Sequence, residues 1–250
     1  GEFTFEFEDK NGNKGTSTAV VNWIDKIAPT ATIEYSTTNP INRDVIARLI
    51  PNEPIIVLNN GSLDLSDPNK DPLTYTFAEN GEFTFEFQDL AGNIGTATAK
   101  VSWIDKEAPV PNVIYDKMEL TNEDVTVTLE FEKENVRITN NNGSNTYTFT
   151  ENGEFTFNYV DAAGNIGSTK VEVNWIDKVV PTATIEYNKT ELTNEDVMAI
   201  IKFNKSNVQI TNNEGKNTYV FTENGEFVFE FKDKAGNIGT ATAKVSWIDK

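Results

Sequence analysis

Oxygen-bearing side chains recur at fixed places along this sequence and are of the kind that holds a divalent cation. Calcium takes about six to eight oxygen ligands at ~2.3–2.6 Å, and carboxylate and amide oxygens are typical ones. Each residue also has a simpler explanation, because Asp and Asn form turns by bonding to nearby backbone N–H groups. The candidates form two sets, Asp44, Glu79, Asp105, Asp161 and Asn165, and then Asp124, Glu151, Asp177, Asp233 and Asn237.

Catalysis has few residue types to draw on. The chain contains no His and no Cys, so the usual general base, zinc ligands and thiol nucleophile are missing. A carboxylate pair, as in glycoside hydrolysis, is the remaining option. However, acidic residues such as Asp89, Asp161 and Asp233 recur in every copy of a repeat, as structural residues do. We therefore expect no enzymatic activity and no catalytic residue.

The net charge is strongly negative, at -18, from 39 acidic and 21 basic residues. Such a surface repels phosphate backbones and anionic lipids, so we expect neither nucleic-acid binding nor membrane insertion. The absence of Cys fits the exterior of a Gram-positive bacterium or a cytosol. The sequence opens in the middle of a pattern, which indicates a segment of a longer chain.

Internal repetition defines the organisation. The tetrapeptide Trp-Ile-Asp-Lys ends at Lys26, Lys106, Lys178 and Lys250, which gives spacings of 80, 72 and 72 residues. Residues 79–106 and 223–250 differ at only three positions. The periodicity predicts four segments: a C-terminal hairpin fragment (1–26), a first module (27–106, with an enlarged loop at 62–71), a second module (107–178) and a third module (179–250).

Hydrophobicity alternates with a period of two inside each module, which indicates β-strands. In residues 82–87 the three Phe side chains share one face, and residues 97, 99, 101 and 103 form a second inward set. Six or seven short strands are expected in each module, including a weak one near residue 140. Turn signals every 8–12 residues or so then predict an all-β, tandem array of small Greek-key β-sandwiches.

Two motifs carry a family resemblance. They are Asp-x-Ala-Gly-Asn-Ile-Gly (89–95, 161–167 and 233–239) and Thr-Asn-Glu-Asp-Val (121–125 and 193–197). With them the chain resembles the bacterial immunoglobulin-like tandem repeat modules of Gram-positive cell-surface and adhesin proteins. The resemblance implies an immunoglobulin-like fold and an extracellular place, at the cell surface or in the cell wall.

The immunoglobulin-like topology implies where the candidate ligands meet. In such a sandwich the A–B loop, the E–F loop and the exit of strand G share one end, and the F–G loop lies at the other end. The first set of candidates would then meet between the first and second modules, and the second set between the second and third. Residues 64–71 of the enlarged loop are another calcium candidate.

The four Trp residues invite a sugar-stacking interpretation, since indole faces stack on pyranose rings. They follow the inward parity of the last strand, which instead predicts packing in the core or at the module end. They are Trp23, Trp103, Trp175 and Trp247.

Three functions fit these features. The first is a non-enzymatic stalk that projects a functional domain from the cell, with neighbouring modules of the same chain as partners. The second is an adhesin that grips a host protein or glycan, for which residues 46–72 are the first place to look. The third is an accessory segment of a secreted glycan-degrading enzyme.

Overall fold

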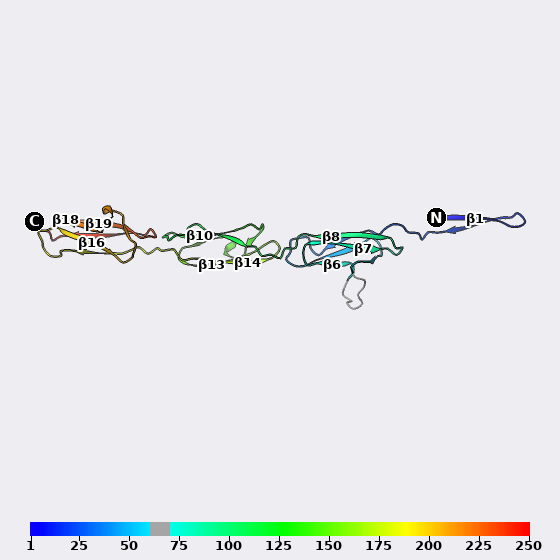
Figure 1. Ribbon diagram of the computed structural model, residues 1–250, viewed down its shortest axis with the longest axis horizontal. Helices are drawn as coiled ribbons and strands as arrows, with labels where there is room; N and C mark the ends of the chain where they lie inside the picture. The colour runs from blue at the N-terminus through cyan, green and yellow to red at the C-terminus, as the bar shows by residue number, and fades with distance from the viewer. Residues whose placement is uncertain (61–70) are drawn as a thin grey trace. The chain divides into compact units, whose positions relative to one another are not determined.

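The computed structural model describes residues 1–60 and 71–250, which form short antiparallel strands joined by loops (Figure 1). The enlarged loop predicted at 62–71, with its calcium candidates, lies outside the described residues except for Asp71. Among the residues that are described, no helix has the length and apolar character that a membrane crossing requires.

Two three-stranded antiparallel sheets make up the first module. One sheet has the order β3-β4-β6 and the other β5-β7-β8. The chain forms the β3–β4 hairpin, crosses to β5, returns to β6 and crosses again to the β7–β8 hairpin, which is a Greek-key path. The strands are β3 (Ala31–Tyr35), β4 (Val45–Pro51), β5 (Ile56–Val57), β6 (Thr74–Phe77), β7 (Gly81–Gln88) and β8 (Ile94–Val101).

The second and third modules repeat this arrangement, which confirms the prediction of tandem β-sandwiches. Their sheets have the orders β12-β10-β9, β11-β13-β14, β15-β16-β18 and β17-β19-β20. The second module contains β9 (Pro111–Tyr115), β10 (Val125–Phe131), β11 (Arg137–Ile138), β12 (Thr146–Phe149), β13 (Gly153–Val160) and β14 (Ile166–Val173). The third contains β15 (Ala183–Tyr187), β16 (Val197–Phe203), β17 (Gln209–Ile210), β18 (Thr218–Phe221), β19 (Gly225–Lys232) and β20 (Ile238–Val245).

By compactness the chain divides into two units, residues 1–107 with 162–165, and residues 108–161 with 166–250. The second unit thus holds most of the second module and all of the third. The module limits read from the periodicity stay a prediction, and the module names are kept for residues 27–106, 107–178 and 179–250.

Each module has its own core, formed by the inward residues of both sheets. In the first module Phe85 and Phe87 of β7 pack against Val45 and Leu49 of β4, and all four side chains are fully buried. The alternation predicted from the sequence is therefore confirmed. Burial of this apolar area is the main favourable term for such small sandwiches.

The tryptophans of the three modules pack at the edge of these cores, as predicted, but the prediction is wrong for Trp23, which follows the β1–β2 hairpin and is 74% exposed. Trp103 meets Tyr35 edge to face, with ring centroids 5.2 Å apart. Trp175 and Trp247 pair in the same way with Tyr115 and Tyr187. Packing against the core is typical of structural tryptophans.

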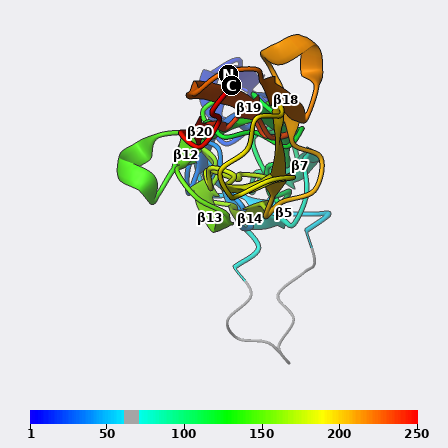
Figure 2. The ribbon, with the colours of Figure 1, turned by 90° about the vertical axis from the view of Figure 1, so that its left-hand side faces the viewer.

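The weak strand predicted near residue 140 is wrong. That segment is a 3₁₀ turn, η1 (Asn141–Gly143), and its counterpart in the third module is η2 (Asn213–Gly215), the orange turn beside β18 in Figure 2. Asn141 and Asn142 have φ values of 49° and 53°, which a strand cannot accommodate. The Asn141 side chain also donates to the carbonyls of Ser144 and Thr146, so the turn supplies its own partners.

The hairpin ahead of the first module consists of β1 (Glu2–Glu8) and β2 (Lys14–Val20). The strands pair in register from Glu2 with Val20 to Glu8 with Lys14. Asp9 closes the turn by accepting hydrogen bonds from the backbone and side chain of Asn13, at 2.9 and 2.8 Å. Even in this two-stranded segment, the Asp–Asn pair therefore shapes the turn.

We expect Gly95→Ala to destabilise the first module by more than the ~1–3 kcal/mol typical of overpacking. A Cβ atom at Gly95 would lie 2.2 Å from the Pro29 carbonyl oxygen, and that backbone group has little freedom to move. The measurement is urea unfolding. Gly81→Ala is the matched control, since its Cβ would meet nothing within 4 Å. Equal unfolding midpoints for the two variants would contradict the prediction.

Candidate functional site

The end of each module is held by the segment that follows its last strand (β8, β14 or β20), which is strand G of the immunoglobulin-like topology. In the first module Asn80 donates its Nδ2 to the Ile104 carbonyl and accepts from the Ile104 N–H, each at 2.8 Å. The Asp105 N–H also donates to the Ile41 carbonyl at 2.9 Å. Asn152 with Ile176 and Asn224 with Ile248 repeat the first contact. These bonds bring the A–B loop, the E–F turn and the strand G exit to the same end.

At this end the lysine of the Trp-Ile-Asp-Lys repeat pairs with the aspartate of the A–B loop. Lys106 Nζ lies 3.0 Å from Asp44 Oδ1 and donates to the Ala78 carbonyl at 2.8 Å. In the second module Lys178 pairs with Asp124 at 2.5 Å. Glu79 and Glu151 of the E–F turns are exposed. The recurring lysine of the Trp-Ile-Asp-Lys repeat is the sequence feature from which this ion pair could have been predicted.

The F–G turn is shaped by its own Asp and Asn. Asp233 Oδ1 accepts from the Asn237 N–H at 2.8 Å, and Oδ2 accepts from Asn237 Nδ2 at 3.0 Å. Both residues are buried. Asp89 and Asn93 make the same two bonds in the first module. This geometry supports turn formation as one role of the Asp-x-Ala-Gly-Asn motif.

The F–G turn of the third module also binds the linker that precedes that module. Asn237 Nδ2 donates to the Asp177 carbonyl at 2.7 Å. The backbone N–H of Asn122 donates to the Ala235 carbonyl at 3.0 Å. The junction of the second and third modules is therefore bound by backbone and side-chain groups of the turn. One module earlier, Asn165 Nδ2 donates to the Asp105 carbonyl at 2.9 Å.

Lys205 joins the carboxylates of this junction. Its Nζ lies 2.9 Å from Asp177 Oδ2 and 3.1 Å from Asp233 Oδ2, and it also donates to the Val179 carbonyl. Hydrogen bonding to Asp177, and then to Asp233, raises the pKa of Lys205. Burial favours the neutral form of Asp233, but the bonds from Asn237 and Lys205 outweigh it and lower the pKa of that carboxyl. An ammonium group thus supplies the positive charge here.

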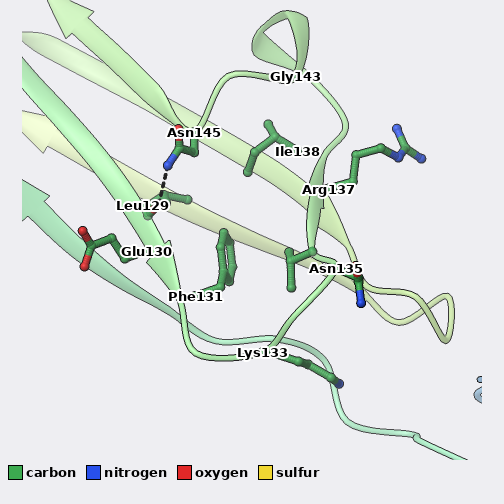
Figure 3. Close-up of a pocket in the computed structure, with 10 residues that line it drawn as sticks. Leu129, Glu130, Phe131, Lys133, Asn135, Arg137, Ile138, Gly143 and Asn145 are labelled. Carbon is green, nitrogen blue, oxygen red and sulfur yellow. Dashed lines mark hydrogen bonds between the residues drawn. The ribbon is translucent and has the colours of Figure 1, made fainter.

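The second module has the counterpart lysine. Lys133 Nζ lies 2.7 Å from Asp161 Oδ2, whose side chain is almost fully buried. Figure 3 shows Lys133 extending away from the hollow that Phe131 and Ile138 line, and the same view shows the hydrogen bond from Asn145 to the Leu129 carbonyl. Neither Lys133 nor Lys205 was among the residues singled out from the sequence.

In the structure, neither predicted ligand set comes together as a whole. Of the second set, Asp177, Asp233 and Asn237 come together around Lys205, whereas Asp124 pairs with Lys178 and Glu151 is exposed. In the first set Asp44 pairs with Lys106, Asp161 pairs with Lys133, and the Asp105 carbonyl accepts a hydrogen bond from Asn165. Glu79 is exposed. Calcium at these two junctions stays a prediction.

The lowered pKa of Asp233 has a measurable consequence. A carboxyl with a lowered folded-state pKa contributes stability that is present above the unfolded value of ~3.9 and is lost as the pH falls through the folded value. We expect the Asp233 carboxyl carbon, followed by NMR, to titrate at lower pH than an ordinary exposed aspartate. Titration of Asp233 at or above ~3.9 would contradict the structure.

Facing antiparallel sheets on a Greek-key path, repeated in tandem, define the class of immunoglobulin-like β-sandwich repeats. A family model described as bacterial Ig-like domain matches residues 180–250. The third module is thus similar to a bacterial Ig-like domain, and residues 79–106 repeat its last part almost unchanged. No curated protein matches the chain.

Solved structures that align with the chain include one of a 1.5-MDa bacterial ice-binding adhesin, at 12% identity and a TM-score of 0.40, covering 88% of this chain and 98% of that one. Extracellular cadherin domains 1–5 of protocadherin gamma B2 align at 12% identity and a TM-score of 0.28, covering 96% and 70%. Escherichia coli alpha-2-macroglobulin aligns at 8% identity and a TM-score of 0.23, covering 98% and 35%.

Proposed function

We propose that this chain is a non-enzymatic spacer segment of an extracellular bacterial surface protein, in which serial modules hold a functional domain away from the cell. The observation that carries this proposal is the bound junction of the second and third modules. There Asn237 and Lys205 of one module engage Asp177 of the linker before it. A spacer keeps its two ends far apart only when its junctions resist bending, and these contacts oppose bending.

The linker itself also favours stiffness. It reads Trp-Ile-Asp-Lys-Val-Val-Pro over residues 175–181 and contains no Gly or Ser. Its Asp177 N–H donates to the Thr121 carbonyl at 2.8 Å, and Asp177 Oδ1 accepts from the Val179 N–H at 3.0 Å. Proline at 181 fixes φ where the next module begins. The segment therefore has few free torsions compared with a Gly/Ser linker.

Spin labels test this stiffness directly, because the chain has no native Cys. Labels on Thr156→Cys and Thr240→Cys lie on exposed positions of β13 and β20, one in each module. We expect pulsed electron–electron double resonance to give one narrow distribution of distances between the two labels. A broad distribution, as from freely jointed modules, would refute the spacer function.

An adhesive role is the second candidate and has its own observation. Ile46 and Ile50 lie on the outer side of β4 and are 45% and 36% exposed, whereas the second module has Thr126 and Glu130 at these positions. Exposed apolar side chains on one face are typical of binding surfaces. The partner would be a host protein or glycan. Capture of such a partner that is lost in an Ile46→Thr, Ile50→Glu variant would support adhesion over a plain spacer.

A further inference from the structure

The dipeptide Asn-Gly recurs along this chain, and it is a sequence that can modify itself. The backbone nitrogen of the glycine attacks the side-chain amide carbon of the asparagine, which closes a succinimide ring and expels ammonia. Water then opens the ring at either carbonyl and leaves aspartate or isoaspartate. Glycine favours the closure because it has no side chain to obstruct it. The pairs that lie wholly within the described residues begin at Asn11, Asn80, Asn142, Asn152 and Asn224.

Three of these pairs hold the asparagine side chain at both of its polar atoms. Asn80, Asn152 and Asn224 each donate to and accept from the backbone of the isoleucine that follows the last strand of the module, at 2.7–2.9 Å. That isoleucine is buried in every module. The amide can therefore turn toward the glycine nitrogen only if the end of the module comes apart.

The pair in η1 has no such restraint. Of the three consecutive asparagines there, Asn140 donates to the Thr156 carbonyl and Asn141 to the Ser144 carbonyl. The Asn142 side chain is exposed and makes no hydrogen bond within residues 1–60 and 71–250. The turn buries none of its residues, and Figure 2 shows it as the green turn beside β12. The amide of Asn142 is therefore free to turn.

The third module shows that this turn does not need an asparagine at the same position. Glu214 replaces Asn142 there, and the two residues have φ values of 52° and 53°. Gly215 and Gly143 both donate their N–H within the turn, at 2.9 and 2.8 Å. In η1 that one backbone bond restrains the attacking nitrogen. A single exposed 3₁₀ turn opens far more readily than a packed module end.

The hairpin ahead of the first module contains a second unrestrained pair. Asn11 is exposed and uses only its backbone N–H, which donates to Asp9 Oδ1 at 2.8 Å, and its side chain has no hydrogen-bond partner among the described residues. The Gly12 N–H donates to the Asp9 carbonyl at 3.1 Å. An isolated two-stranded hairpin is marginally stable in water, so this turn also opens readily.

We propose that Asn142 and Asn11 are sites of spontaneous deamidation, at which the amide is converted to a mixture of aspartate and isoaspartate. The equivalent reaction at Asn80, Asn152 and Asn224 is suppressed by the fold. Each conversion consumes one water, releases one ammonia and adds one negative charge to the chain. The modification does not depend on the spacer function.

Peptide mapping by mass spectrometry tests the proposal on the full chain, aged in mildly alkaline buffer because the attacking nitrogen must lose its proton. A converted residue gains the mass difference between an amide and an acid, and chromatography separates isoaspartate from aspartate. We expect Asn142 and Asn11 to convert at least about tenfold faster than Asn152, which corresponds to about 1.4 kcal/mol of restraint from the two side-chain hydrogen bonds.

The same chain in urea is the control, since loss of the fold should bring all of the pairs to similar rates. The Asn142→Glu variant copies the third module, so its turn should form, and ion-exchange chromatography should show acidic species that arise from Asn11 alone. Equal rates at Asn142 and Asn152 in the folded chain would overturn the proposal. So would an unchanged Asn142 under conditions in which the pairs convert in urea.

Discussion

The Phe229→Ala variant is expected to destabilise the third module severely. Phe229 of β19 is fully buried, and its ring packs edge to face on Phe227 at a centroid distance of 4.9 Å. Removing a buried Phe costs about 3–5 kcal/mol through lost burial and the cavity left behind. A module of this size has only about 4–11 kcal/mol of total stability, so one substitution removes from about a quarter to all of it.

Hydrogen exchange read by mass spectrometry localises this effect. We expect β15 to β20 to lose protection, while β3 to β8 keep theirs because the first module has a separate core. The neighbouring Val228→Thr is the control, since Val228 points outward and the first module has Thr84 there. It should shift stability by no more than about 0.5 kcal/mol. Full protection of β19 in Phe229→Ala would contradict the assigned core.

Asn237→Ala is expected to loosen the junction of the second and third modules as well as its own turn. The variant loses the bond to the Asp177 carbonyl and the side-chain bond to the buried Asp233 carboxylate. The bond to the charged Asp233 carboxylate is worth about 1.5–3 kcal/mol, and the bond to the neutral Asp177 carbonyl about 0.5–1.5 kcal/mol. We expect a less stable third module and a wider distance distribution between labels at positions 156 and 240.

The β1–β2 hairpin supplies a control for this variant. Asn13 makes the same two bonds to Asp9, and no bond from its side chain to a linker is found within the described residues. Asn13→Ala should therefore leave the distance distribution unchanged. If Asn237→Ala also leaves it unchanged, the turn does not hold the junction.

The strands were predictable because a local pattern determines them. The period-two placement of Phe83, Phe85 and Phe87 fixes which face is buried, and this held in all three modules. The strand near residue 140 failed because consecutive Asn residues tolerate positive φ, and no hydrophobic alternation reveals that preference.

The junction was harder to predict because its partners are distant in sequence. Asp, Asn and Glu side chains were recognised as oxygen donors, but Lys205 reaches Asp177 and Asp233 across 28 residues in each direction. Only the folded chain shows that this lysine lies between them.

The cross-strand charge pairs also bear on whether neighbouring modules could exchange strands during folding. Glu226 of β19 lies opposite Lys244 of β20 and pairs with it at 2.6 Å, and Glu82 with Lys100 repeats this in the first module. The hairpins of the first and third modules are thus interchangeable, but the second module separates them along the chain. In the second module Glu154 of β13 faces Glu172 of β14, so exchanging β14 and β20 would leave the numbers of like-charge and opposite-charge pairs unchanged. These charge pairs alone therefore do not protect the chain from the domain swapping to which repetitive chains are prone.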